Sequence, residues 1–185
     1  MISSEWLTPP RVSGIVAYGV AATCSGIAWA RTRNAQKGLK IAALLTIVEG
    51  ALLLDMIANG RWMLHQLFIG FAQRRHEYDF RRLPQTIVVA VLVGILLAGL
   101  LWTVRVFRAR IGVLLAVSGV MLSVISWCVE VVSLHAVDAI LYRPVGSLMV
   151  VSFVWILASL LTSFGILFDS HQANPGKQYP ADKPQ

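Results

Sequence analysis

The chain has 185 residues, of which 57% are hydrophobic and 14% are charged, and its mean hydropathy is +0.70. Soluble domains carry about 25% charged residues, so this composition excludes an ordinary soluble domain and favours helices surrounded by lipid. The net charge of +7 comes from Arg and Lys that fall mainly at the ends of apolar runs. Cations anchor helices to lipid headgroups at such places, so we expect the lipid bilayer, and not nucleic acid, as a partner.

Five runs of the sequence are long and apolar enough to cross a bilayer, which takes about 20 residues. They are residues 12–30, 41–59, 86–104, 111–134 and 145–168. We predict an all-α integral membrane protein with a single bundle of five transmembrane helices over residues 1–170, followed by a disordered polar tail over residues 171–185. We expect Pro9 and Pro10 to lie just before the first helix, and Pro84 just before the third.

The segment between the second and third runs, residues 60–85, has a mixed pattern. Apolar side chains such as Trp62 and Leu67 alternate there with polar ones such as Gln66 and Arg74. Such a pattern is typical of an amphipathic helix at a membrane interface. We therefore predict an amphipathic or protruding helical segment here rather than a loop.

Small and polar residues form a stripe along the fourth run, at alternating steps of four and three that place them on one helical face. They are Gly112, Ala116, Gly119, Ser123, Ser126, Glu130 and Ser133. The first run carries Gly14, Ala17, Ala21, Ser25 and Ala28 in a similar stripe, and the last carries Ser152, Ser159 and Ser163. Small residues let helix backbones approach closely in lipid. We predict that the first, fourth and fifth helices pack through these faces, and that the bulky, acid-free third helix is the most lipid-exposed.

Three acids lie within the five runs: Glu49, Asp55 and Glu130. A carboxylate at the centre of a membrane helix costs about 2.5–3.5 kcal/mol on insertion scales, so such groups are usually paired, neutral or functional. Glu49 lies near the middle of its run. We expect it to be either a protonated carboxyl bonded to a hydroxyl of another helix, or a proton carrier or substrate contact. All three acids are candidate catalytic groups.

Polar residues gather at one end of the predicted bundle, because the second and fourth helices run in opposite directions. The group comprises Asp55, Arg61, His65, Glu130, His135, Asp138, Tyr142 and Arg143. The opposite ends of the runs are expected to carry cations and no acids. This asymmetry indicates either a salt-bridge network, in which Arg61 or Arg143 neutralises an acid, or a site in a cleft. The predicted substrate-binding residues are Arg61, Tyr142, Arg143 and Trp127.

A metal site is a minor alternative, because His65, His135 and Asp138 supply imidazole and carboxylate ligands. The sequence has no HExxH, HxxxH or Glu-x-x-His motif, and His135 and Asp138 are a near pair of ligands, three residues apart. We therefore favour no metal, and the sequence requires no cofactor.

Orientation follows from the Lys and Arg residues that flank the helices. In the five-helix arrangement, nine of the 16 lie on the side of the C-terminus and seven on the side of the N-terminus. Cytoplasmic loops carry the excess of positive charge. We therefore predict a multipass protein of the cell membrane, with its N-terminus outside and its C-terminus in the cytoplasm.

Two kinds of function fit these features. The leading hypothesis is an accessory or scaffold subunit of a membrane assembly, whose partner is a membrane protein or a second copy of the chain. It rests on the small-residue packing stripes and on a sequence that contains no complete set of catalytic residues. The alternative is a small membrane enzyme or carrier with a polar pocket between the second and fourth helices, acting on a lipophilic or small anionic molecule.

Overall fold

The computed structural model describes residues 8–32, 36–74, 82–132 and 135–172, and they are almost entirely helical. The elements are α1 (Pro9–Thr32), α2 (Gln36–Ala58), α3 (Gly60–Arg74), α4 (Arg82–Phe107), α5 (Ile111–Val132), α6 (His135–Leu141), β1 (Pro144–Val145), β2 (Leu148–Met149) and α7 (Val150–Gln172). Five of the helices, α1, α2, α4, α5 and α7, are long and apolar enough to cross a membrane. The predicted all-α class and the five long apolar helices are therefore confirmed.

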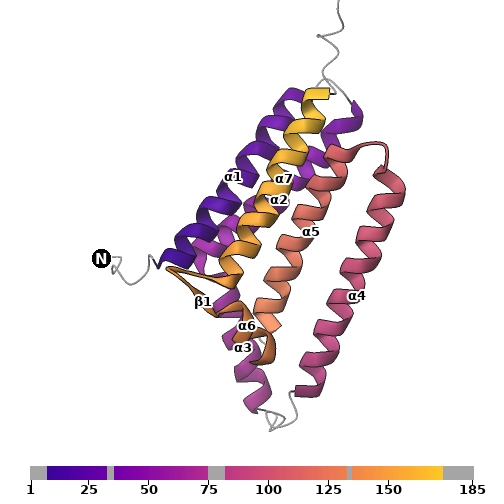
Figure 1. The fold of residues 1–185 in the computed structure, drawn as a ribbon. Coiled ribbons are helices and arrows are strands. Elements are labelled where there is room, and N and C mark those ends of the chain that lie inside the picture. Colours follow the sequence, from indigo (N-terminus) through magenta and orange to yellow (C-terminus); the bar gives the residue numbers. More distant parts are fainter. Residues whose placement is uncertain (1–7, 33–35, 75–81, 133–134, 173–185) are drawn as a thin grey trace, which may run out of the picture.

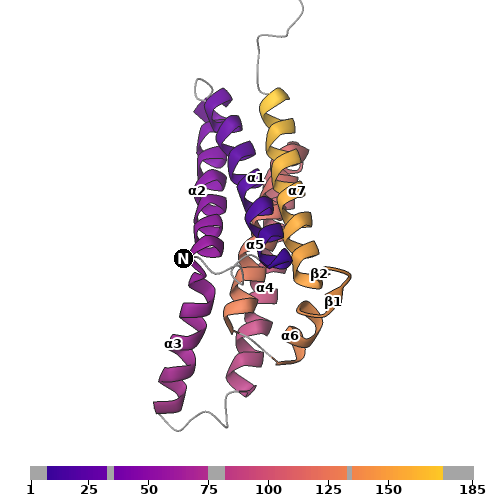
Figure 2. The same cartoon turned by 90° about the vertical axis from the view of Figure 1, so that its left-hand side faces the viewer.

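Four of the long helices form the core of the bundle (Figure 1). α7 packs extensively against both α1 and α5, α1 packs against α2, and smaller contacts between α2 and α5 close the ring. α4 stands outside this ring and packs mainly against α5. The described ends of the chain, at the start of α1 and the end of α7, lie at opposite ends of the bundle (Figures 1 and 2).

The small-residue stripes lie at the predicted contacts. Every described member of the three stripes is buried, whereas Ser133 falls outside the described residues. The closest approach is between α5 and α7, where a Cβ atom added at Gly165 would lie 2.5 Å from both the amide nitrogen of Ala116 and the carbonyl oxygen of Gly112. These backbones can meet only because no side chain separates them.

The third apolar run forms the most exposed of the long helices, as its composition predicted. In the most apolar 18-residue stretch of α4, 6% is buried inside the bundle, whereas the corresponding value for the other four helices is 28–50%. Large side chains such as Ile95, Leu97 and Trp102 are exposed on its surface. α4 therefore presents apolar side chains to its surroundings over most of its circumference.

The segment between the second and third long helices is helical, as expected. α3 follows α2 after a break at Asn59 and extends past the ends of the core helices, beside the start of α4 (Figure 2). The short α6 and the β1–β2 hairpin occupy this same end of the bundle. One end is thus built from short, irregular elements.

Two kinds of boundary differ from the sequence prediction. Pro9 and Pro10 lie inside the first turn of α1, and Pro84 lies inside the first turn of α4, rather than before these helices. The amide nitrogens of a first turn have no acceptor within the helix, so proline loses nothing there and its fixed φ suits the helix.

The start of the last helix was also predicted too early. Residues 144–149 form an antiparallel hairpin in which Val145 pairs with Leu148, and α7 begins at Val150. Gly146 has a φ of 65°, which suits the tight turn of a hairpin and not a helix. α7 then continues to Gln172, four residues beyond the predicted end, and the rest of the predicted tail lies outside the described residues.

The α5–α7 contact gives a direct test of the packing. Gly165→Ala should lower the free energy of unfolding by about 1–3 kcal/mol, because the added methyl group meets backbone atoms that cannot move aside. Gly94→Ala on α4 is the matched control, since a Cβ atom there meets nothing within 4 Å, and it should leave stability unchanged or slightly higher. Unfolding of both variants in detergent measures the difference, and equal effects would contradict the packing.

Candidate functional site

A break in the chain between α2 and α3 builds the first part of the site. Asn59 has a positive φ of 58°, a conformation that Asn tolerates better than most residues and that ends a helix. The helix is interrupted there and resumes at Gly60, and across this break Nε of Arg61 donates to Oδ2 of Asp55 at 3.0 Å. In an unbroken helix, residues six apart point in different directions and could not make this bond. Gly60 leaves room for it, because a Cβ atom there would lie 2.6 Å from Oδ1 of Asp55.

Arg61 also reaches across to α5. Its Nη1 donates to Oε2 of Glu130 at 2.6 Å, and 12% of the Arg61 side chain and 2% of the Glu130 side chain remain exposed. The guanidinium carbon lies 5.3 Å from the centre of the Trp155 ring, at the distance of a cation–π contact. Arg61 therefore joins α3 to α2, α5 and α7 at once.

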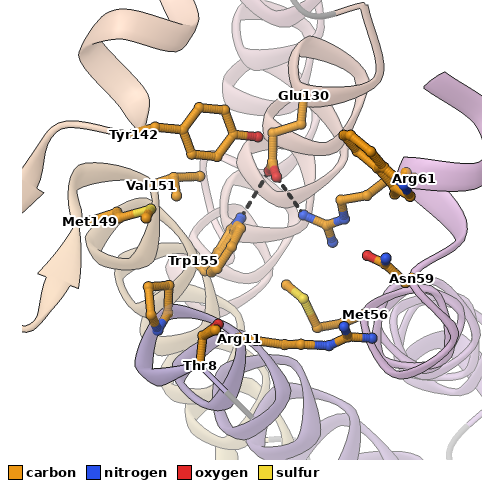
Figure 3. A pocket seen from close by; sticks show the side chains of 12 residues that line it. Thr8, Arg11, Met56, Asn59, Arg61, Glu130, Tyr142, Met149, Val151 and Trp155 are labelled. Carbon is orange, nitrogen blue, oxygen red and sulfur yellow. Dashed lines mark hydrogen bonds and ion pairs between the residues drawn. The ribbon is translucent and has the colours of Figure 1, made fainter. Parts of the chain in front are cut away.

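Glu130 is held as a hydrogen-bond acceptor by three groups. Besides Arg61, Nε1 of Trp155 donates to its Oε1 at 3.1 Å (Figure 3). The hydroxyl of Ser126 donates to the same oxygen at 3.3 Å. Donors on both oxygens favour the charged form of a carboxyl. Glu130 thus accepts hydrogen bonds as a carboxylate paired with Arg61.

A pocket of about 440 Å³ lies against this ion pair. It is lined by Thr8, Pro10, Arg11, Met56, Asn59, Arg61, Trp62, Glu130, Tyr142, Met149, Val151 and Trp155. Most of the lining is apolar or aromatic, with a few charged and polar groups converging on one side (Figure 3). Small-molecule sites have this character and typically enclose about 300–1,000 Å³.

Two side chains of the pocket wall, Arg61 and Tyr142, are hydrogen-bond donors, because their surroundings keep both of them protonated. Burial lowers the pKa of Arg61, but the neighbouring Glu130 and Asp55 carboxylates outweigh it and hold that pKa above its ordinary value. Burial, together with the charges of Glu130 and Asp138, raises the pKa of Tyr142. At neutral pH Arg61 is therefore a cation, and Tyr142 keeps the proton of its hydroxyl.

Three of the predicted site residues line the pocket: Arg61, Glu130 and Tyr142. Asp55 stands behind the lining as a partner of Arg61. Asp55, Arg61, Glu130 and Tyr142 therefore lie together at one end of the bundle.

The other predicted site residues lie elsewhere. Glu49 is buried in the middle of the bundle, where it meets Thr162. Trp127 packs against the edge of an apolar cluster outside the pocket lining, and Arg143 is exposed beside the hairpin. These three side chains do not meet at the pocket.

The residues of the alternative metal site are not seen as a cluster. His65 lies in α3 and His135 and Asp138 lie in α6, but the side chains of the two histidines are outside the described ones. Within the described residues, no three His, Cys, Asp or Glu side chains gather as metal ligands do.

The expectation that the opposite end of the bundle lacks acids is wrong. Asp169, near the end of α7, is buried and accepts hydrogen bonds from Arg110, at 3.1 Å from Nε and 2.5 Å from Nη2. The prediction ended the last helix at residue 168 and so left this acid out. Both ends of the bundle therefore carry an acid paired with arginine.

Sequence reasoning missed the role of Trp155, which donates to Glu130 and faces Arg61. Its position was readable, because Trp155 lies three residues after Ser152 and four before Ser159 and so shares the packing face of α7. The turn at Asn59 was readable too, because Asn-Gly is a common turn dipeptide. The part played by Arg11, which lines the pocket from α1, had no such local signal.

Comparison of the chain with protein-family models, with curated proteins and with solved structures yields no significant match.

The two acids bound to Arg61 should differ in their effect on stability. Glu130→Gln should lower the free energy of unfolding by about 3–5 kcal/mol, because it removes one member of a buried ion pair and leaves the other charge behind. Asp55→Asn should cost less, since Asp55 is more exposed than Glu130 and Arg61 would keep its stronger partner. Unfolding in detergent measures both values, and a larger loss for Asp55→Asn would contradict the geometry.

Proposed function

We propose that this chain is an integral membrane protein whose pocket binds a small lipophilic molecule with an anionic or hydrogen-bond-accepting group. The observation that carries the proposal is the Arg61–Glu130 pair, 2.6 Å long, on the wall of a mainly apolar pocket. A buried charge pair is costly unless the chain makes use of it or fully satisfies it. Here Nη2 of Arg61 is buried and has no hydrogen-bond partner among the described residues.

The chemistry of the pocket supports this class of ligand. Arg61 and Arg11 bring cations to the lining, and Tyr142 brings a hydroxyl that keeps its proton. Met149 and Val151 line the pocket with apolar surface. A molecule with an acceptor group at one end and a hydrocarbon body would satisfy both parts of the pocket.

Binding is a better account of this site than acid–base catalysis. Glu130 already accepts from Arg61, Trp155 and Ser126, and Asp55 accepts from Arg61. Carboxylates engaged in this way are poor bases, because a proton would have to displace their donors. In this proposal Glu130 and Asp55 are positioning residues that fix the guanidinium of Arg61.

The location of the pocket follows from the proposed topology. With the N-terminus outside and the C-terminus in the cytoplasm, the end of the bundle that holds α3, α6 and the hairpin faces outward. The excess of Lys and Arg on the side of the C-terminus supports this orientation. The pocket would then take up its ligand from the outer side of the cell membrane.

A second candidate function rests on α4. Its exposed apolar surface would allow a helix of another membrane protein to pack beside it, since among the described elements α4 packs mainly against α5. The chain would then be an accessory subunit of a larger assembly. Native electrophoresis of the solubilised membrane tests this: an accessory subunit should migrate with a partner of fixed mass, and a monodisperse single chain would exclude that role.

Photo-crosslinking with a diazirine-labelled long-chain fatty acid tests the proposed ligand class. In membranes, the probe should label peptides that line the pocket, and an excess of unlabelled fatty acid should suppress this labelling while leaving the labelling of α4 by bulk lipid unchanged. Met149→Trp should reduce pocket labelling at least about tenfold, because the larger side chain fills the pocket.

Leu160→Trp is the matched control, since it adds the same side chain to an exposed position of α7. It should leave the labelling of the pocket as it is. Labelling spread evenly over the exposed helices and insensitive to Met149→Trp would contradict the proposed binding.

A further inference from the structure

Three acids in the described part of the bundle are buried, and their partners differ. Glu130 is paired with Arg61, and Asp169 is paired with Arg110. Glu49 has 0% of its surface exposed and forms no ion pair with any described cation. Its one hydrogen-bond partner among the described residues is the hydroxyl of Thr162 on α7.

The surroundings of Thr162 decide which group donates. The Thr162 hydroxyl lies 3.0 Å from the carbonyl oxygen of Ala158 and 3.2 Å from Oε1 of Glu49. A hydroxyl has one hydrogen, and a carbonyl oxygen can only accept. Thr162 can share its single hydrogen between the two oxygens, or it can donate to Ala158 alone and accept a hydrogen bond from a protonated Glu49. The second arrangement gives two full hydrogen bonds and is the stronger one.

The electrostatic surroundings favour the same form. Tyr18 on α1 is a titratable group within electrostatic reach of Glu49, and its hydroxyl is neutral, while α7 presents the hydroxyl of Thr162. On α5 the acid Glu130 is neutralised by Arg61. On α2 itself, Asp55 points to Arg61 as well. A buried carboxylate without a cation beside it is strongly disfavoured, and the group takes up a proton instead.

Glu49 lies in a polar layer that separates two apolar clusters. One cluster, at the pocket end, includes Tyr18, Leu52 and Trp155, and the other, farther along the bundle, includes Ala28, Leu45 and Ile166. Between them each core helix contributes buried polar side chains: Ser25, Glu49, Ser123, Thr162 and Ser163. Oε2 of Glu49 and the hydroxyls of the three serines have no hydrogen-bond partner within the described part of the chain.

Tyr18 lies outside the pocket lining but contacts Trp155, which belongs to it. Its ring packs beside Trp155, with 6.4 Å between ring centres, and it lies within electrostatic reach of Glu49, Glu130 and Arg61. It is fully buried, and its hydroxyl makes no hydrogen bond of good geometry with a described residue. A hydroxyl in this position can accept one proton and release another, as proton relays do.

We propose that Glu49 is a proton-binding site at the centre of the bundle, which carries its proton at neutral pH and exchanges it with the pocket through the hydroxyl of Tyr18. In one exchange the Glu49 proton passes to the Tyr18 oxygen while the Tyr18 proton leaves toward the pocket, and a proton that returns along the same path protonates Glu49 again, so charge and atoms balance. This inference goes beyond the proposed ligand and does not require that any ligand is bound.

Infrared spectroscopy of the purified chain at neutral pH tests the bound proton. The wild type should show the carbonyl stretch of a protonated carboxyl, shifted in heavy water, and Glu49→Gln should lose it. Thr162→Val should keep the band but move it to higher frequency, because the hydrogen bond is lost. Absence of the band in the wild type, or its persistence in Glu49→Gln, would overturn the proposal.

The route is tested by the rate at which this band shifts after transfer to heavy water. Tyr18→Phe should slow the shift at least about tenfold, because the ring keeps its packing but loses the hydroxyl that relays the proton. Ser25→Ala, which removes a hydroxyl from the same helix at the level of the polar layer, is the control and should leave the rate unchanged. An unchanged rate in Tyr18→Phe would refute the route.

Stability gives an independent check. Gln has the shape of a protonated Glu, so Glu49→Gln should change the melting temperature by less than about 3 °C, which is close to the effect of a minor substitution in a chain of this size. Glu130→Gln, the same exchange at an ionised acid, should lower it by much more. Equally large losses of melting temperature in both variants would contradict a protonated Glu49. If Glu49→Gln does not fold, the infrared band of Thr162→Val is the test: a band at the wild-type frequency would then contradict the proposal.

Discussion

A single guanidinium holds the functional end of this bundle together. Arg61 binds Asp55 and Glu130 through separate nitrogen atoms and lies over the ring of Trp155, so that α2, α3, α5 and α7 all meet at one side chain. The charges are mostly removed from water, so each depends on the others for compensation. The pocket takes its shape from this arrangement, because Arg61, Glu130 and Trp155 all belong to its wall.

The close packing of the helices makes such a buried network possible. Glycine, alanine and serine along α1, α5 and α7 bring the backbones together, which keeps the polar side chains away from the surface of the bundle. Acids near the two ends are paired with arginine, whereas Glu49 in the middle meets a hydroxyl. Whether a buried acid of this bundle is paired with a cation thus depends on the side chains beside it, and the hydropathy of its helix does not reveal this.

The parts of this structure that could be predicted depend on periodic patterns. The stripes from Gly112 to Glu130 and from Gly14 to Ala28 indicated the packing faces, and the inward direction of Glu130 followed from its stripe. The hairpin at Gly146 was missed because its residues are as apolar as the helix that follows. The pairing of Arg110 with Asp169 was missed because it joins helix ends 59 residues apart, and such distant partners leave no local signal. The sequence left open whether Arg61 or Arg143 binds Glu130. The choice of Arg61 depends on the break at Asn59, because a helical pattern does not give the geometry of such a break.

The central claim is that Arg61 and Glu130 form a buried pair that stabilises the bundle at the pocket. A double-mutant cycle with Arg61→Gln, Glu130→Gln and the combined variant, followed by unfolding in detergent, measures it most directly. The account predicts a coupling free energy of about 2 kcal/mol or more, with the combined variant losing clearly less than the sum of the two single losses. Losses that add to within about 0.5 kcal/mol would show that the two residues do not interact, and would contradict the account.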